Sequence, residues 1–396
     1  MLQQLNQSEA FWILYISNLQ LTNFRNYRHL NIDIPSGVVA VHGNNAQGKT
    51  SLLEAIYLLA IAKAYRAGGD RQAVGVDPDN TEASANISGV VHRKSDVVRI
   101  SVGMRIDRGL DGYSQPTFQK NISINGIRRS ATDLVGVVNA VLFDPQDIDL
   151  IVGAPALRRK YLDILICQLD RIYLRSLQTY QKIIYQRNHL LRLIRDKRAA
   201  YPELDYWNEA MVNEGTKLIL RRHEVVEELK NLSEEVHRRV TGIETGMEIG
   251  YSPGMALGNF VEEEIRKSFT NILEDSLDKE VASGLSQSGP HRDDLVIRVD
   301  GRDAATFASR GQARGLAIAL RLAEGAILER VRGESPIVLL DDVLSELDTL
   351  RSRRLLDYAC DMEQAFVSTT DLERIEKSIL VRSTKMLVSN GAIQKM

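Results

Sequence analysis

The sequence predicts an α/β fold in which a nucleotide-binding lobe is interrupted by a helical insertion lobe. A glycine-rich loop lies between a short apolar stretch, 37–42, and a helix-like stretch that begins near 51. A second apolar stretch, 336–340, ends in two aspartates. Between these features, from about 155 to 245, apolar residues recur every three or four positions, as on one face of a helix.

The same patterns predict four segments. Residues 1–13 form an N-terminal extension, 14–150 the first half of the lobe, 151–285 the helical arm and 286–396 the second half. Period-two alternation predicts strands at 14–21, 84–92, 96–106 and 121–127, the last turning at Asn125-Gly126.

The helical region breaks at 199–202, Ala-Ala-Tyr-Pro, which predicts two long helices packed as a hairpin. Residues 241–290 form a looser stretch. After it we expect a strand at 295–299 that turns at Asp300-Gly301, a helix at 312–332 and a buried strand at 336–340.

The glycine-rich loop fits the phosphate-binding pattern G-x-x-x-x-G-K-[ST]. Its backbone N–H groups and the start of the next helix suit phosphate oxygens. Lys49 is predicted to reach the β- and γ-phosphates of ATP, and Thr50 to offer its hydroxyl to Mg²⁺. A chance glycine-rich turn is the alternative, but the order of strand, loop and helix argues against it. The predicted nucleotide-binding residues are Gly43, Asn44, Asn45, Ala46, Gln47, Gly48, Lys49 and Thr50.

Two aspartates follow the apolar stretch 336–340 and resemble a Walker B strand. Asp341 is predicted to hold Mg²⁺ through water, and Asp342 to orient the attacking water as a catalytic carboxylate beside Lys49. The alternative is a buried parallel strand that ends in a solvated acidic turn.

A Ser-Arg-Gly-Gln segment precedes the helix at 312–332, and Ser-Glu-Leu-Asp at 345–348 follows the two aspartates. This order of motifs is that of ABC-type ATPase heads, in which the serine segment covers the γ-phosphate held by a second subunit. We therefore predict that Ser309, Gly311 and Gln312 bind nucleotide; an ordinary helix N-cap is the alternative. Most such heads carry Glu where this chain has Asp342, and the shorter side chain predicts slow hydrolysis.

Two further residues are candidates for the nucleotide site. Arg25 suits a phosphate because its guanidinium matches oxyanions, although a solvated loop arginine or a DNA-backbone contact fits equally. Gln146 lies where the chain enters the helical arm and is predicted to sense Mg²⁺; the alternative is an exposed turn residue after Pro145.

Positive charge collects on the first part of the helical arm, although the whole chain has a net charge of −2. Eleven Lys or Arg residues lie between 158 and 198, against three Asp. A helix with one basic face can follow duplex phosphates without reading bases, so Arg187, Arg192 and Arg195 are predicted to bind DNA. The alternative is a solvated helix face.

Four segments together resemble the RecF family of bacterial recombinational repair proteins, whose ATPase heads are of the ABC/SMC type. They are Leu-Thr-Asn-Phe-Arg-Asn-Tyr at 21–27, Ser-Gly-Pro-His-Arg-Asp-Asp-Leu at 288–295, Ala-Ser-Arg-Gly-Gln at 308–312 and Leu-Asp-Asp-Val-Leu-Ser-Glu-Leu-Asp at 340–348. The resemblance covers the chain from about residue 14 to its end. It implies ATP-dependent homodimerisation, slow DNA-stimulated hydrolysis, and binding of double-stranded and gapped DNA. It also implies work with RecO and RecR in loading the RecA recombinase during repair, replication and the SOS response.

Two other functions share parts of this pattern. One is the head of another DNA-processing complex, such as an SMC-like or overcoming-lysogenisation-type ATPase; the short arm and the lack of a nuclease cluster argue against it. The other is a transporter's ATPase subunit, which the basic arm and the Asp341-Asp342 pair disfavour. We expect a cytoplasmic protein without a membrane partner, since no apolar run of about 18 residues and no basic leader occurs.

Overall fold

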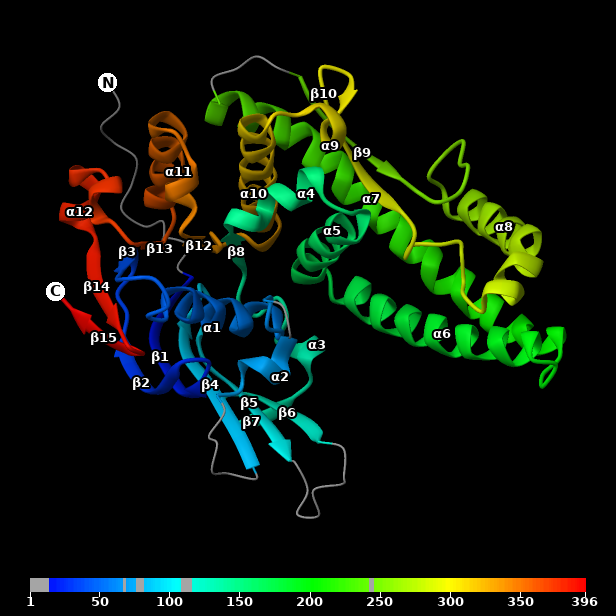
Figure 1. Cartoon of the computed structure of the whole chain (residues 1–396), viewed down its shortest axis with the longest axis horizontal. Coiled ribbons are helices and arrows are strands. Elements are labelled where there is room, and N and C mark those ends of the chain that lie inside the picture. Colours follow the sequence, from blue (N-terminus) through cyan, green and yellow to red (C-terminus); the bar gives the residue numbers. More distant parts are fainter. Residues whose placement is uncertain (1–13, 67–68, 76–81, 108–115, 242–245) are drawn as a thin grey trace. The chain divides into compact units, whose positions relative to one another are not determined.

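The computed structural model describes residues 14–66, 69–75, 82–107, 116–241 and 246–396; the expected extension 1–13 lies outside this part (Figure 1). The chain forms two compact units. The split unit comprises the residues up to 145 and from 324 onward, and the inserted unit comprises 146–323. The second boundary falls inside α10 (Arg310–Arg332), later than the expected 285/286. The reasons are that β10 (Asp294–Val299) pairs with β9 (Met247–Ser252) of the insertion, and that Arg321 of α10 forms a 2.7 Å ion pair with Asp147 of the same unit.

Among the described residues, the split unit contains two six-stranded sheets. The first is antiparallel and has the order β2 (Tyr27–Asp33), β1 (Tyr15–Phe24), β4 (Glu82–His92), β5 (Val97–Asp107), β6 (Thr117–Ile124), β7 (Ile127–Arg129). The second has the order β15 (Ala392–Lys395), β14 (Thr384–Ser389), β3 (Gly37–His42), β13 (Gln364–Thr369), β12 (Ile337–Asp341), β8 (Ala140–Phe143). Neighbouring strands of this sheet are parallel to each other, except that β14 and β15 are antiparallel.

Helix α1 (Lys49–Ile61) contacts strands of both sheets, which explains why nearly all of its residues are buried. Strands β12 and β13 of the parallel sheet are buried along their whole length, because α1 contacts both and α11 (Thr349–Asp361) contacts β13 as well. The other short elements of this unit are α2 (Gly69–Ala73), α3 (Ala131–Leu134), η3 (Val343–Glu346), η4 (Leu372–Arg374) and α12 (Lys377–Arg382).

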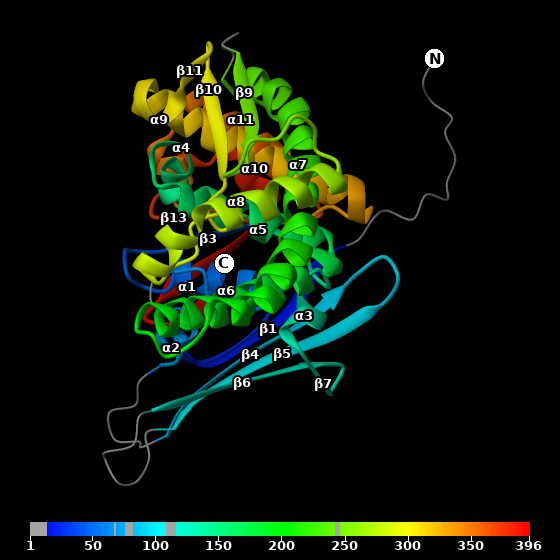
Figure 2. The same ribbon diagram turned by 90° about the vertical axis from the view of Figure 1, so that its right-hand side faces the viewer.

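The inserted unit consists of helices around a small antiparallel sheet with the order β11 (Arg302–Asp303), β10, β9 (Figure 2). Helix α7 (Asp205–Thr241) packs against α6 (Arg171–Arg195), α8 (Glu262–Ser283) and β9, so the expected helical hairpin is present. The helices are α4 (Asp149–Val152), α5 (Pro155–Leu169), α6 (Arg171–Arg195), α7 (Asp205–Thr241), α8 (Glu262–Ser283), α9 (Ala304–Phe307) and α10, with η1 (Pro145–Ile148) and η2 (Tyr201–Leu204).

Two expectations for this unit were wrong. The first arm is two helices, because Asp170 caps α6 by accepting the N–H groups of Ile172 and Tyr173 at 2.7 and 3.1 Å. The stretch 241–290 is more ordered than expected, since it contains β9 and the 22-residue helix α8. By contrast, the turns at Asn125-Gly126 and Asp300-Gly301 are confirmed, with positive φ at all four residues.

Candidate nucleotide-binding site

The glycine-rich loop runs from the end of β3 to the start of α1, in the predicted order of strand, loop and helix. Gly43 has φ 153°, and a Cβ there would lie 2.3 Å from the carbonyl oxygen of Val388. Gly48, with φ 121°, stands at the N-cap of α1. Only glycine fits these two positions. With glycine there, the loop turns tightly into α1, and the N–H groups at the start of this buried helix have no partner inside the helix.

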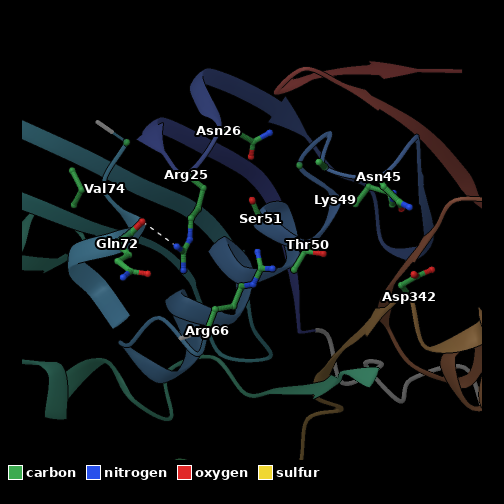
Figure 3. Close-up of a pocket in the computed structure, with 13 residues that line it drawn as sticks. Arg25, Asn26, Asn45, Lys49, Thr50, Ser51, Arg66, Gln72, Val74 and Asp342 are labelled. Atoms are coloured by element: carbon green, nitrogen blue, oxygen red, sulfur yellow. Dashed lines mark hydrogen bonds between the residues drawn. The ribbon is translucent and has the colours of Figure 1, made fainter. Parts of the chain in front are cut away.

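A cavity of about 670 Å³ opens beside this loop (Figure 3). Lys49 projects along the loop and donates hydrogen bonds to the carbonyls of Gly43 and Asn44, at 2.7 and 2.9 Å. Burial lowers the pKa of the Lys49 ammonium, and the neighbouring aspartates oppose that change. The lining residues are Arg25, Asn26, Asn45, Ala46, Gly48, Lys49, Thr50, Ser51, Arg66, Gln72, Val74, Gly75 and Asp342.

The first Walker B aspartate lies beside the loop. The Thr50 hydroxyl is 3.0 Å from Asp341 Oδ1, and Ser368 donates a 2.8 Å hydrogen bond to the same oxygen. Burial raises the pKa of the Asp341 carboxyl, while the hydrogen bonds from Ser368 and Thr50 favour its charged form. A hydroxyl and a carboxylate oxygen are the hard ligands that Mg²⁺ prefers, so this pair fits the ion.

Asp342 lies in the cavity wall with left-handed backbone, φ 52°. Its N–H donates to Ser368 Oγ at 3.0 Å, so Ser368 holds both aspartates in place. Burial raises the pKa of the Asp342 carboxyl, and the Lys49 ammonium opposes the rise. Sequence reasoning missed Ser368, although it stands in register with Asp341 on the neighbouring parallel strand.

Arg25 lines the cavity, but its guanidinium already has a partner. Nε and Nη2 donate to the two carboxylate oxygens of Glu54 at 2.9 and 2.8 Å, and Glu54 is fully buried. Nη1 donates to the carbonyl of Gln72 at 3.0 Å (Figure 3). The predicted phosphate contact of Arg25 therefore remains a proposal, and its position is set by Glu54.

Two residues after α1 join the site without a sequence motif to mark them. Arg66 lines the cavity, and the Tyr65 hydroxyl lies 3.4 Å from Asp341 Oδ2. Burial raises the pKa of Tyr65, so this phenol stays a neutral hydrogen-bond donor.

The Ser-Arg-Gly-Gln segment belongs to the inserted unit and begins α10. Ser309 Oγ accepts the N–H of Gln312 at 3.2 Å, and Gln312 Oε1 accepts the N–H of Ser309 at 2.9 Å. This is a capping box, with Ser309 exposed and Gly311 in the first turn. Gln146 is exposed in η1 of the same unit. The nucleotide roles of Ser309, Gly311 and Gln312, and the Mg²⁺ role of Gln146, remain predictions.

Of the three predicted DNA contacts, the one at Arg187 is wrong. Its side chain is fully buried and forms a 2.6 Å ion pair with Glu280, which is equally buried. It also donates to Asn208 Oδ1 and Ser286 Oγ, each at 2.8 Å. The basic residue lies on the packed side of α6, so it cannot meet a DNA phosphate.

Arg192 and Arg195 are exposed, as a DNA contact requires. Four exposed basic residues define a basic stripe on α6: Arg171, Arg175, Lys182 and Arg192. At 100° per residue they fall within an arc of about 100°, and they span about 32 Å at 1.5 Å per residue. Arg195 lies outside this arc and pairs with Asp196 at 3.2 Å.

The fold and the cavity define a P-loop ATPase head of the ABC/SMC class with a helical insertion, which confirms the expected fold class. A family model described as the RecF/RecN/SMC N terminal domain matches residues 15–393. A protein named "DNA replication and repair protein RecF" from Herpetosiphon aurantiacus is 35% identical over 390 residues, 96% of this chain and 99% of the relative. A protein of the same name from Chloroflexus aggregans is 36% identical over 395 residues, 96% of this chain and 99% of that one.

A solved structure agrees with these relatives. It is described as "Structure of the recombination mediator protein RecF-ATP in RecFOR pathway" and has a TM-score of 0.87 and 30% identity, covering 99% of this chain and 100% of the other. This chain belongs to the RecF family of ATPases. In the part that the structure describes, no helix is long and apolar enough to cross a membrane.

Proposed function

We propose that this protein is an ATP-driven switch that dimerises on double-stranded DNA near gaps. Slow ATP hydrolysis then releases the protein from the DNA. The observation that carries the proposal is the Thr50–Asp341 pair, 3.0 Å apart beside a glycine-rich loop whose cavity also holds Lys49 and Asp342. Membership of an ATPase family and likeness to a structure described as RecF with ATP support the same function.

Each side chain has a proposed role in the reaction. The loop N–H groups and Lys49 bind the β- and γ-phosphates, and Thr50 and Asp341 hold Mg²⁺. Bound Mg²⁺ supplies positive charge that offsets the charge developing on the phosphates. Asp342 orients the attacking water, and its side chain, one methylene shorter than Glu, accounts for slow turnover.

We place the Ser309 segment over the nucleotide of a second copy. Ser309 is exposed at the N-terminus of a 23-residue helix, where free N–H groups and the helix dipole favour a phosphate. Gly311 and Gln312 in the first turn belong to the same contact. Two such composite sites form in a homodimer.

The shared site has a direct test. Ser309→Arg is expected to leave ATP binding by the monomer near normal while abolishing ATP-driven dimerisation. Mixing Ser309→Arg with Lys49→Ala should restore partial ATPase activity, because one composite site in the mixed dimer is intact. Mixed dimers that form but show no hydrolysis would argue for cleavage within one subunit.

We assign the duplex contact to the basic stripe on α6. Its length of about 32 Å is close to one turn of B-DNA, about 34–36 Å, so its four cations suit phosphates along one face of the duplex. Duplex binding by such a face depends on salt and not on base sequence. The proposed setting is the cytoplasm, with RecO and RecR as partners in loading the RecA recombinase at gapped DNA. The neighbouring solved structure is described as part of the "RecFOR pathway", which supports this setting.

Charge removal tests the duplex contact. Replacing Arg171, Arg175 and Lys182 by Ala should make the negative slope of log affinity against log salt shallower by about 2.7, at about 0.9 per phosphate contact. The matched control removes three exposed cations of α7, Lys217, Lys230 and Arg238, whose side chains are 57%, 51% and 59% exposed. Equal slopes for the two triple variants would place the DNA surface elsewhere. The overall proposal is tested by measuring dimerisation with and without ATP and gapped DNA; a dimer population indifferent to both would contradict it.

A further inference from the structure

The C-terminal hairpin, β14 and β15, reaches the phosphate-binding loop from outside the cavity. β14 pairs with β3, which leads into the loop (Figure 1). The main-chain N–H of Asn390, in the hairpin turn, donates to Gln47 Oε1 at 2.7 Å, and that of Gly391 donates to the Gln47 carbonyl at 3.1 Å. Neither turn residue is among those that line the cavity.

Asn26, in the turn between β1 and β2, and Tyr27, at the start of β2, hold the loop in the same way. Asn26 Nδ2 donates to the Gln47 carbonyl at 2.8 Å, so that carbonyl accepts two hydrogen bonds. The Tyr27 hydroxyl donates to the Gly48 carbonyl at 3.0 Å, and the N–H of Leu52 in α1 donates to the same carbonyl at 3.0 Å. Two successive carbonyls of the loop are therefore held by groups from outside it.

Anchoring these carbonyls also orients the N–H groups on the opposite side of the loop. In a trans peptide the C=O and the N–H point in opposite directions. Holding the Gln47 carbonyl toward the hairpin turns the N–H of Gly48 the other way, and holding the Gly48 carbonyl does the same for the N–H of Lys49. Gly48 and Lys49 both line the cavity, and N–H groups at this place in a strand–loop–helix are phosphate donors.

We infer that Asn390 and Gly391 of the C-terminal hairpin, together with Tyr27, are positioning residues that aim the loop's main-chain donors at the nucleotide phosphates. The fit is close. Gly391 has φ 72°, and a Cβ there would lie 2.4 Å from the carbonyl oxygen of Asn26. An alanine at 391 would push the turn away from both Asn26 and Gln47.

The chain offers a matched control in the same unit. Asn125-Gly126 is a second Asn-Gly hairpin turn, with φ 52° and 78°, against 48° and 72° at Asn390-Gly391. A Cβ at Gly126 has nothing within 4 Å. Gly126→Ala therefore introduces the same left-handed strain without touching the phosphate-binding loop.

The experiment measures steady-state ATP hydrolysis by the full chain and by Gly391→Ala, Gly126→Ala and Tyr27→Phe. The inference rests on the proposed ATPase function. We expect Gly391→Ala to raise KM for ATP about tenfold, the worth of one to two hydrogen bonds, with kcat within about twofold. Tyr27→Phe, which removes only the hydroxyl, should raise KM by about three- to tenfold. Gly126→Ala should leave KM unchanged.

The results of this experiment distinguish a failure of the positioning inference from a failure of the proposed function. If Gly391→Ala instead lowers the maximal rate at unchanged KM, as a smaller folded fraction would, and Tyr27→Phe has the KM of the unaltered chain, the positioning inference is overturned. If Gly391→Ala and Gly126→Ala raise KM equally, the effect is strain alone and the inference also fails. A chain that neither binds nor hydrolyses ATP before any substitution would refute the proposed function itself.

Discussion

Arg187→Ala should strongly destabilise the inserted unit. Arg187 and Glu280 are both fully buried, and their 2.6 Å ion pair lies where α6 meets α8. Glu280 Oε1 keeps one hydrogen bond, from the N–H of Gln287 at 2.7 Å, but the variant removes the counter-ion of its charge. Leaving a buried charge unpaired costs about 3–5 kcal/mol.

The assay is urea unfolding followed by the fluorescence of Trp207, which packs against the buried cluster Leu190, Leu191, Ile194, Leu204 and Val281. Trp12, the second tryptophan of the sequence, is replaced by Phe in every variant so that the signal reports this unit alone. At an m value of about 3 kcal/mol/M, the loss lowers the urea midpoint by about 1–1.7 M.

Arg192→Ala is the control, because this arginine is exposed on the same helix. It should change the free energy of unfolding by no more than about 0.5 kcal/mol. The double variant Arg187→Met/Glu280→Leu should regain most of the loss, since apolar side chains can replace a buried ion pair. Equal midpoints for Arg187→Ala and Arg192→Ala would refute the reasoning and return Arg187 to the candidates for DNA contact.

Three further predictions concern the cavity and pH. Lys49→Ala should weaken ATP binding by at least about 100-fold, since the ammonium in the cavity wall is lost; an unchanged dissociation constant in equilibrium dialysis would contradict the P-loop assignment. Asp342→Asn should lower kcat about 100-fold while dimers persist with uncleaved ATP, and turnover at the normal rate would exclude a water-orienting role. Burial lowers the pKa of His291 from 6.5 to about 4, so between these values the unfolded chain binds more protons and stability falls as pH falls. The free energy of unfolding should fall by about 2 kcal/mol between pH 7 and 5, and this fall should disappear in His291→Gln. Equal urea midpoints at the two pH values would show that this imidazole titrates normally.

The sequence by itself determined the elements that depend on local chemistry. Phosphate-binding loops need glycine at fixed positions between a strand and a helix, so the motif at 43–50 locates both elements and the loop. The Asn-Gly and Asp-Gly turns are equally local, because they need positive φ at adjacent residues. The pairing of Thr50 with Asp341 followed from the same motifs, whose chemistry requires a hydroxyl and a carboxylate at one ion.

Local pattern was weaker at the boundaries between helices and in the stretch after the helical hairpin. Apolar residues recur through 155–198, but only the capping by Asp170 ends one helix and starts the next. Helix α8 was overlooked even though Ile265, Phe269 and Leu273 are buried at four-residue spacing. That spacing was the available signal for a helix.

The tertiary structure alone decided which charged residue faces which environment. Arg187 and Arg192 lie on one basic helix, yet α7 and α8 cover the first and leave the second exposed. The partners that hold the cavity also come from distant parts of the chain: Glu54 for Arg25, Ser368 for Asp341, and the turn at 390–391 for Gln47. A sequence motif identifies the residues that contact a ligand. The groups that orient those residues are determined by tertiary packing, which has no fixed spacing along the chain.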